Sequence, residues 1–191
     1  MKNAIILHGM PSKEDYYNPN ADNESDCHWI NWLQRQLMVR DIYTATPEMP
    51  LSYRPDYEIW KKEFERYDVT PETILVGHSC GGGFLVRWLS EQPDVAVGKV
   101  VLVAPWINVD HEVDIAFFDG LKIDSTLMNR TKGVTIFISD DDDESIHKSV
   151  QQIVSEVPGI KRVDFKGYGH FCYGDMKTKE FPELLKEITS S

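Results

Sequence analysis

Cysteine is scarce in this sequence of 191 residues, which contains only Cys27, Cys80 and Cys172. The three are far apart, odd in number and form no Cys-x-x-Cys pair. A disulfide framework and a cysteine-based zinc site are therefore not expected. So few cysteines favour a reducing compartment, and we expect a cytoplasmic protein.

Long apolar runs are also missing. A membrane-spanning helix needs about 20 consecutive apolar residues, and no stretch of the sequence approaches that length. The opening segment, MKNAIILHGM, has one lysine and a short apolar run, which is too little for a signal peptide with its cleavage site. We interpret this segment as a first buried strand and expect no membrane association.

Positive charge is in short supply, with 20 lysines and arginines against 31 aspartates and glutamates and a formal net charge of −11. Phosphate groups would be repelled, so a nucleic-acid or anionic-membrane partner is not expected. A small neutral substrate remains compatible with this charge, and no protein partner is indicated. The hydrophobic content of 41% is ordinary for a soluble globular protein and allows a well-buried core.

Short apolar runs alternate with helical patterns along the whole chain. The runs are mostly continuous rather than alternating, as in strands that are covered on both faces. We predict a single domain over residues 1–191, a three-layer α/β/α sandwich with about six mostly parallel strands. Its ligand should lie at the carboxyl ends of the strands. The predicted strands are 4–7, 42–45, 73–76, 100–103, 134–138 and 162–165, and the predicted helices lie near 29–37, 57–67, 84–89, 146–154 and 181–188.

One segment, residues 106–132, is longer than a simple crossover needs. It could form a small cap over the strand ends, with Trp106, Phe117 and Phe118 as candidate substrate-binding residues. An ordinary irregular helix packed on the sheet, with these aromatic side chains in the core, is an equally good interpretation.

The pattern GHSCG at residues 77–81 places Ser79 between an apolar run and a helical pattern. A nucleophile elbow has this arrangement, with the serine on a sharp strand-to-helix turn and glycines that let the two elements approach. The N–H group of Cys80, at the start of the helix, would be one oxyanion donor. We therefore interpret Ser79 as a nucleophile. The alternative is a glycine-rich turn that serves close packing alone.

A serine nucleophile needs a general base. Hydrolases with such an elbow order their triad Ser, acid, His along the chain, which excludes His8 and His78. Of the later histidines, His170 follows the last predicted strand in the glycine-rich loop KGYGHF. His111 lies in the long segment and His147 in a predicted helix. We predict His170 as the base, the alternative being a loop histidine that binds backbone.

An orienting acid should follow the strand at 134–138, where the run DDDDE occupies residues 140–144. Five adjacent charges cannot all be buried, so most must be solvated and one should turn toward His170. The residues alone do not say which. Cation binding is a weaker alternative, because the run lacks the spaced ligands and central glycine of a calcium loop.

The segment LHGMPS follows the first predicted strand, which should lie beside the strand that ends at the elbow. A second oxyanion N–H is expected from this loop, where Gly9 and Met10 are the candidates. The alternative is an ordinary strand-terminating turn.

Several motifs in the same order resemble one family. IILHG, HWINWLQRQL, PEMPLSYRPDYEIWKKEF, TILVGHSCGG, KVVLVAPW and GYGHF are similar to segments of the small serine hydrolases related to retinoblastoma-binding protein nine and their bacterial relatives, within the α/β-hydrolase superfamily. The resemblance covers nearly the whole chain and fades between residues 106 and 132. Single motifs of this kind are weak, but together they are specific.

The resemblance implies a compact α/β-hydrolase core and Ser-Asp-His catalysis without a metal or cofactor. It implies Asp143 as the acid, with Asp142 as the fallback, although Glu144 and His147 stand where the family often has proline. We thus predict a carboxylesterase-like serine hydrolase that cleaves a small ester, thioester or amide through Ser79, Asp143 and His170. The alternatives are an acyltransferase with the same triad and a non-catalytic protein-binding module on this fold.

Overall fold

Six strands form one sheet in the computed structural model, which describes residues 2–190. Their order across the sheet is β2-β1-β3-β4-β5-β6, and every neighbouring pair is parallel. The predicted fold class is confirmed, with all strands of this sheet parallel. The strands are β1 (Asn3–Leu7), β2 (Tyr43–Ala45), β3 (Ile74–His78), β4 (Val100–Val103), β5 (Val134–Ser139) and β6 (Lys161–Phe165).

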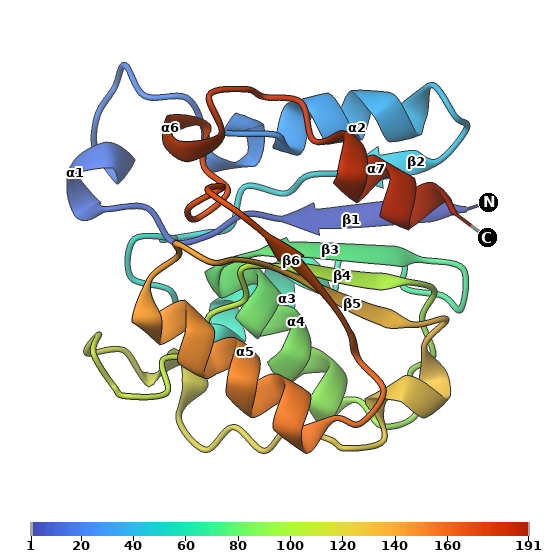
Figure 1. Ribbon diagram of the computed structural model, residues 1–191. Helices are drawn as coiled ribbons and strands as arrows, with labels where there is room; N and C mark the ends of the chain where they lie inside the picture. Colours follow the sequence, from blue (N-terminus) through green and yellow to red (C-terminus); the bar gives the residue numbers. More distant parts are fainter. Residues whose placement is uncertain (1, 191) are drawn as a thin grey trace.

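Helices cover both faces of this sheet (Figure 1). One face carries α2 (Ile30–Met38) and α7 (Pro182–Thr189), and the other carries α3 (Tyr57–Phe64), α4 (Cys80–Glu91) and α5 (Glu144–Glu156). None of the helices within residues 2–190 is long and apolar enough to cross a membrane. The short elements are the α-helical turns α1 (Lys13–Tyr16) and α6 (Tyr173–Met176) and the 3-10 turns η1 (Glu24–Asp26), η2 (Ala116–Phe118) and η3 (Leu127–Arg130).

The central strands are apolar because both of their faces are covered. Every residue of β3, β4 and β5 is buried, whereas β6, at the edge of the sheet, has exposed residues. On the face of α3 and α4, Trp60, Phe64 and Phe84 are fully buried with ring centroids 5.4 to 5.9 Å apart. Each such side chain contributes roughly 1.5–3 kcal/mol through removal of apolar surface from water. This core fixes the strand ends that carry the site.

Residues 106–132 pack beside α3 and α4 instead of forming a cap over the strand ends. The Phe117 ring lies 5.0 Å from that of Trp60, and the Phe118 ring lies 5.6 Å from that of Trp106. All three side chains from this segment are almost fully buried. Their large apolar area is therefore used in the core.

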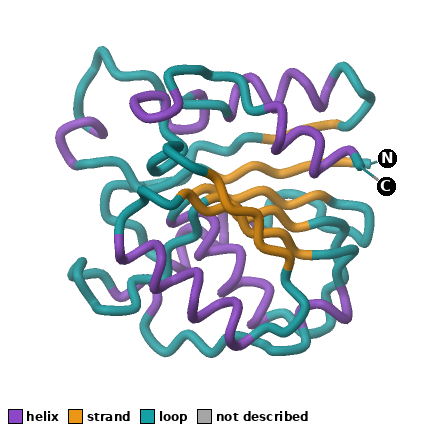
Figure 2. The backbone as a smooth tube through the Cα atoms, viewed as in Figure 1, coloured by secondary structure: helices purple, strands orange, loops and turns teal. Residues whose placement is uncertain are grey.

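The loops that follow the strands meet at one edge of the sheet, because parallel strands all end on the same side (Figure 2). The loops after β1, β3, β5 and β6 carry, in that order, His8, Ser79, the acidic run and His170. This edge is where a doubly wound sheet holds its ligand.

Candidate active site

Ser79 lies on the turn between β3 and α4 with an unusual backbone conformation, φ 52° and ψ −121°. A non-glycine residue in such a conformation costs on the order of 1–3 kcal/mol and persists only where its surroundings hold it. Here the Ser79 N–H donates to the Val103 carbonyl at 2.9 Å, and the Ser79 carbonyl accepts from the Trp106 N–H at 3.1 Å. Hydrogen bonds at both the N–H and the carbonyl of Ser79 therefore hold the strained turn in place.

Gly81 explains why the turn needs a glycine after the serine. A Cβ atom at this position would lie 2.3 Å from the backbone oxygen of His8, a distance that real Cβ atoms do not tolerate. The first turn of α4 thus packs directly against the end of β1. As a result, the start of α4 and the loop after β1 lie on either side of Ser79.

The loop after β1 approaches Ser79 closely. A Cβ atom built on Gly9 would lie 3.0 Å from the Ser79 Cβ. Within residues 2–190, the N–H groups of Met10 and Cys80 donate to no protein acceptor. The N–H of Cys80 is also at the positive end of the α4 dipole. Unpaired N–H groups from the loop after β1 and from the start of α4 therefore lie beside the serine, where a negative oxygen could be bound.

His8 holds this loop in place. Its Nε2 accepts a 2.8 Å hydrogen bond from the Met49 N–H, and its Nδ1 lies 2.7 Å from the Gly9 carbonyl oxygen. The two contacts require a neutral imidazole with the proton on Nδ1. Burial lowers the pKa of His8, in agreement with this state. The buried ring thereby fixes the Gly9 backbone beside Ser79.

His170 lies in the loop after β6 and pairs with a carboxylate. Its Nδ1 lies 3.0 and 3.2 Å from the two carboxylate oxygens of Asp142. The Asp142 side chain is 1% exposed, whereas the imidazole is 29% exposed. Asp142 also accepts the Asp143 N–H at 2.8 Å. A shielded carboxylate thus orients the imidazole and leaves its Nε2 free.

The prediction of Asp143 at this position is corrected to Asp142, the fallback. β5 ends at Ser139 and α5 begins at Glu144, so only four residues separate the strand from the helix. Asp143 occupies the N-cap position of α5, but its exposed side chain makes no capping hydrogen bond. Asp142, one residue earlier in the turn, is the aspartate whose carboxylate contacts His170.

A second histidine supports the loop of His170. The Nε2 of His78 lies 2.8 Å from the His170 carbonyl oxygen and must carry the proton, because a carbonyl only accepts. The two rings lie 5.0 Å apart. Burial, followed by the neighbouring His170 and His28, holds the pKa of His78 well below its usual value. His78 is therefore a neutral donor to the His170 backbone.

Ser79 and His170 line one cavity of about 270 Å³. Among residues 2–190, no hydrogen bond joins the Ser79 hydroxyl to the imidazole. The cavity is also lined by Gly9, Met10, Pro11, Ser12, Asp15, Glu24, His28, His78 and Cys172.

Glu24 gives this cavity an unusual carboxyl group. Burial, followed by repulsion from Glu48 and Asp15, raises the pKa of Glu24 to about 7. His28 lies nearby and accepts the Tyr173 N–H at 3.2 Å. Sequence reasoning missed these residues, because only the folding of segment 12–28 over the strand ends brings them to Ser79.

The aromatic residues expected at the substrate pocket lie elsewhere. Trp106, Phe117 and Phe118 are buried and do not line the cavity of Ser79. Phe117 instead lines a larger cavity of about 760 Å³ that also holds Arg87 and Tyr57 and contains neither Ser79 nor His170. The prediction of these three residues as pocket lining is therefore corrected. These aromatic side chains are instead buried in the core beside α3 and α4.

Over the described range, residues 2–190, no cluster of three or more His, Cys, Asp or Glu side chains has the arrangement to hold a metal ion. The acidic run after β5 instead faces backbone N–H groups and the His170 imidazole.

Solved structures share this fold. The ydeN gene product of B. subtilis matches with a TM-score of 0.81 at 20% identity, covering 99% of this chain and 97% of that chain. A pyrethroid hydrolase from Sphingobium faniae JZ-2 matches with a TM-score of 0.62 at 14% identity, covering 98% and 95%. A monoacylglycerol lipase from Paleococcus ferrophilus matches with a TM-score of 0.62 at 14% identity, covering 97% and 91%. At these identities the likeness shows the fold.

Sequence comparison supplies the family. No curated protein shows a significant match to this chain. The profile of the serine hydrolase family matches residues 18–189, which is most of the chain. This span includes Ser79 on its strained turn, the Asp142–His170 pair and the strands that bring them together. The protein therefore belongs to the serine hydrolase family and is a hydrolase of the α/β-hydrolase fold.

Proposed function

We propose that the protein hydrolyses small carboxylic esters, thioesters or amides with Ser79 as nucleophile, His170 as base and Asp142 as the orienting acid. One observation carries this proposal. The imidazole bound to the shielded Asp142 carboxylate lines the same cavity as Ser79, whose backbone has the strained conformation of a nucleophile elbow.

In the first step Ser79 Oγ attacks the substrate carbonyl carbon while its proton moves to His170 Nε2. Asp142 binds the Nδ1–H and stabilises the imidazolium that forms. The carbonyl oxygen becomes an oxyanion between the N–H groups of Cys80 and of Met10 or Gly9. Collapse of this intermediate expels the leaving group, which takes the proton from Nε2, and leaves an acyl group on Ser79.

In the second step a water molecule takes the place of the leaving group. His170 Nε2 accepts a proton from the water, which attacks the acyl carbon, and the carboxylic acid leaves as Ser79 regains its proton. The His170 imidazole thus returns to its starting state.

The size of the cavity favours a small acyl group. Its volume of about 270 Å³ lies just below the usual range of about 300–1,000 Å³ for drug-sized ligands. The residues that line it include Met10 and Pro11 but no lysine or arginine. A short, uncharged acyl group suits these walls better than an anionic one.

Labelling with a fluorophosphonate probe tests the proposal. Such a probe forms a covalent bond with an activated serine, so wild-type protein should be labelled and Ser79→Ala should not. Hydrolysis of p-nitrophenyl acetate should follow the same pattern. Equal labelling of both proteins would assign the nucleophile to another residue, and labelling of neither would favour a binding function for this fold.

The fate of the acyl group separates hydrolysis from acyl transfer. With p-nitrophenyl acetate as donor, we expect acetate as the main product even when an alcohol or amine acceptor is added. A product that contains the acceptor, formed in preference to acetate, would instead assign an acyltransferase.

The three free cysteines support a cytoplasmic location, which fractionation of the source cells would test.

A further inference from the structure

We propose that Asp141 is a positioning residue of this active site, which sets the register between the Asp142 carboxylate and the His170 imidazole. The proposal rests on the proposed function, because it concerns how the pair of that site is held. The proposal gives the acidic run at residues 140–144 a second role, in addition to that of Asp142, whose carboxylate is shielded.

The backbone of the His170 loop is held by side chains rather than by a strand ladder. Four consecutive N–H groups, those of residues 167–170, each donate to a side-chain oxygen. The acceptors are Asp140 for Gly167 at 3.0 Å, Ser139 for Tyr168 at 2.9 Å, Asp141 for Gly169 at 2.9 Å and Asp175 for His170 at 3.0 Å.

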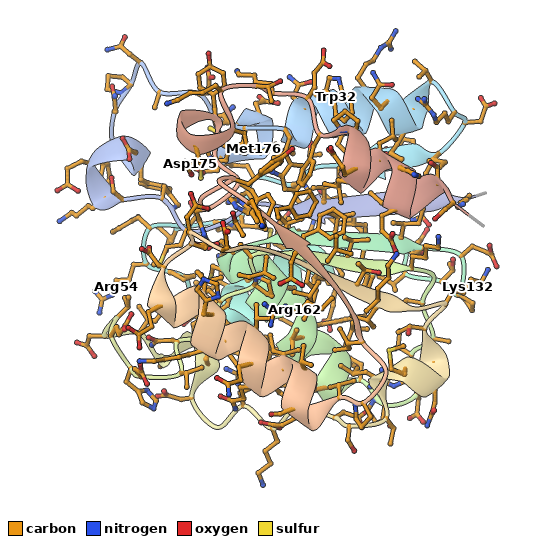
Figure 3. All side chains as sticks on the ribbon, in the orientation of Figure 1. Trp32, Arg54, Lys132, Arg162, Asp175 and Met176 are labelled. Atoms are coloured by element: carbon orange, nitrogen blue, oxygen red, sulfur yellow. The ribbon has the colours of Figure 1, made fainter. Side chains whose placement is uncertain are left out.

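The conformation of the loop makes this possible. Gly167 and Gly169 have positive φ angles of 71° and 49°, and they alternate with Tyr168 and His170, which do not. Such alternation turns successive N–H groups toward a common side and creates a concave site for anionic oxygens. Asp175, which accepts the His170 N–H, comes from α6 (Figure 3). A Cβ atom on Gly169 would lie 2.5 Å from the Asp175 Cγ, so the loop fits these carboxylates closely.

Asp141 has the central place among these acceptors. Its Oδ1 accepts both the Gly169 N–H and, at 2.6 Å, the Ser139 hydroxyl, and Ser139 in turn accepts the Tyr168 N–H. The hydrogen bond from Ser139, followed by that from Gly169, lowers the pKa of Asp141. The carboxylate is therefore an ionised acceptor, which makes stronger hydrogen bonds than a neutral one.

The register follows from sequence adjacency. Asp141 precedes Asp142, and Gly169 precedes His170, so the Asp141–Gly169 contact lies directly beside the Asp142–His170 contact. A shift of the 167–170 backbone relative to the end of β5 would move the imidazole away from its carboxylate. A misplacement of about 1 Å in a catalytic group can cost about a hundredfold in rate.

Three variants test this role with p-nitrophenyl acetate. Asp141→Ala removes the acceptor, and kcat should fall roughly tenfold to a hundredfold while KM changes less than about twofold. Asp141→Asn keeps an oxygen that can accept both hydrogen bonds and should retain at least about a third of the wild-type kcat. Asp143→Ala is the matched control, since Asp143 makes no side-chain hydrogen bond to the described chain, and should change kcat by less than about twofold.

A readout without turnover keeps this test separate from that of the proposed function. In a Ser79→Ala background, the downfield proton resonance of His170 Nδ1–H reports its bond to Asp142. Adding Asp141→Ala should broaden or shift this resonance and speed exchange of the Gly169 amide by more than about tenfold, whereas Asp141→Asn should not. Failure of wild-type labelling would refute the hydrolase chemistry alone. An unchanged resonance and kcat in Asp141→Ala, or equal losses in the Ala and Asn variants, would refute the positioning role.

Discussion

His78 Nε2 donates a 2.8 Å hydrogen bond to the backbone carbonyl of His170, so the residue before the elbow serine holds the loop that carries the imidazole. β3 and the loop after β6 are thereby joined by a side chain that is almost fully buried. Two parts of the site that are far apart in the sequence are thus fixed to one another independently of the acidic run.

Loss of this bond should affect both stability and rate. His78→Leu leaves the His170 carbonyl with only the weak Cys172 thiol as donor, at 3.7 Å. Loss of the imidazole donor costs about 1–3 kcal/mol, or roughly 2–12 °C in the melting temperature of a protein this size. We expect kcat for p-nitrophenyl acetate to fall at least about tenfold at a temperature where the variant is folded. His78→Gln retains an N–H donor and should recover part of both losses. An unchanged kcat in the folded Leu variant would contradict the role of His78.

The identity of the acid can be read from paired substitutions. Asp142→Asn keeps the size of the side chain but removes the charge that stabilises the imidazolium, so kcat should fall by roughly 10³–10⁴, as for an analogous triad. Asp143→Asn should remain within about twofold of wild type, because its side chain is exposed at the start of α5. Labelling rates with a fluorophosphonate probe give an independent measure. A greater loss in Asp143→Asn would restore the original assignment.

Glu24 should make stability depend on pH in an unusual direction. Its pKa is raised from 4.5 to about 7, so the folded protein binds a proton more tightly than the unfolded chain between these values. Stability contributed by the protonated form is present below about pH 4.5 and is lost as pH rises through about 7. Glu24→Gln should therefore stabilise the protein at pH 8 relative to pH 5, by on the order of 1 kcal/mol after screening by solvent.

Urea unfolding of both proteins at pH 5 and pH 8 measures this effect. The difference in unfolding free energy between Glu24→Gln and wild type should be more favourable at the higher pH. Lys13→Gln, which changes an exposed residue with no ion pair among residues 2–190, serves as the control. A difference that is the same at both values would show that Glu24 titrates near its ordinary pKa.

The acyl-chain preference should be independent of Phe117. This residue is buried against Trp60 and lies outside the cavity of Ser79. Phe117→Leu should lower the melting temperature, because a core substitution leaves unfilled volume at a cost of about 1–3 kcal/mol. The ranking of p-nitrophenyl esters from acetate to octanoate should stay the same. A shift of the ranking toward longer chains would return Phe117 to the acyl pocket.

Most of the fold could be predicted from the sequence, because the patterns that indicate strands and helices are local. Continuous apolar runs marked most strands of a sheet covered on both faces, and the elbow and the glycine-rich His170 loop stood at the strand ends expected for them. Membership of a small serine hydrolase family of this fold, expected from the order of the motifs, is confirmed by the family match over residues 18–189.

The remaining features depend on geometry that the residue types do not encode. Four identical aspartates have no pattern to distinguish them, and a one-residue difference in the turn after β5 decides that Asp142 faces inward. Aromatic side chains such as Phe117 and Phe118 occur both in hydrophobic cores and in substrate pockets, so the residue type does not distinguish the two. Glu24 and His28 reach Ser79 only through tertiary folding, and their one local signal is a polar segment that follows the HGMPS loop.

The backbone conformation of Ser79 lowers stability, whereas the hydroxyl group at this position is needed for catalysis. Its φ of 52° and ψ of −121° match the first central position of a type II′ turn, which glycine adopts at lower cost than serine. A glycine at position 79 would ease folding and remove the hydroxyl. Laboratory evolution under selection for heat resistance alone should therefore drift toward Ser79→Gly, whereas selection for hydrolysis should retain serine. At position 79, selection for stability therefore favours glycine and selection for hydrolysis favours serine.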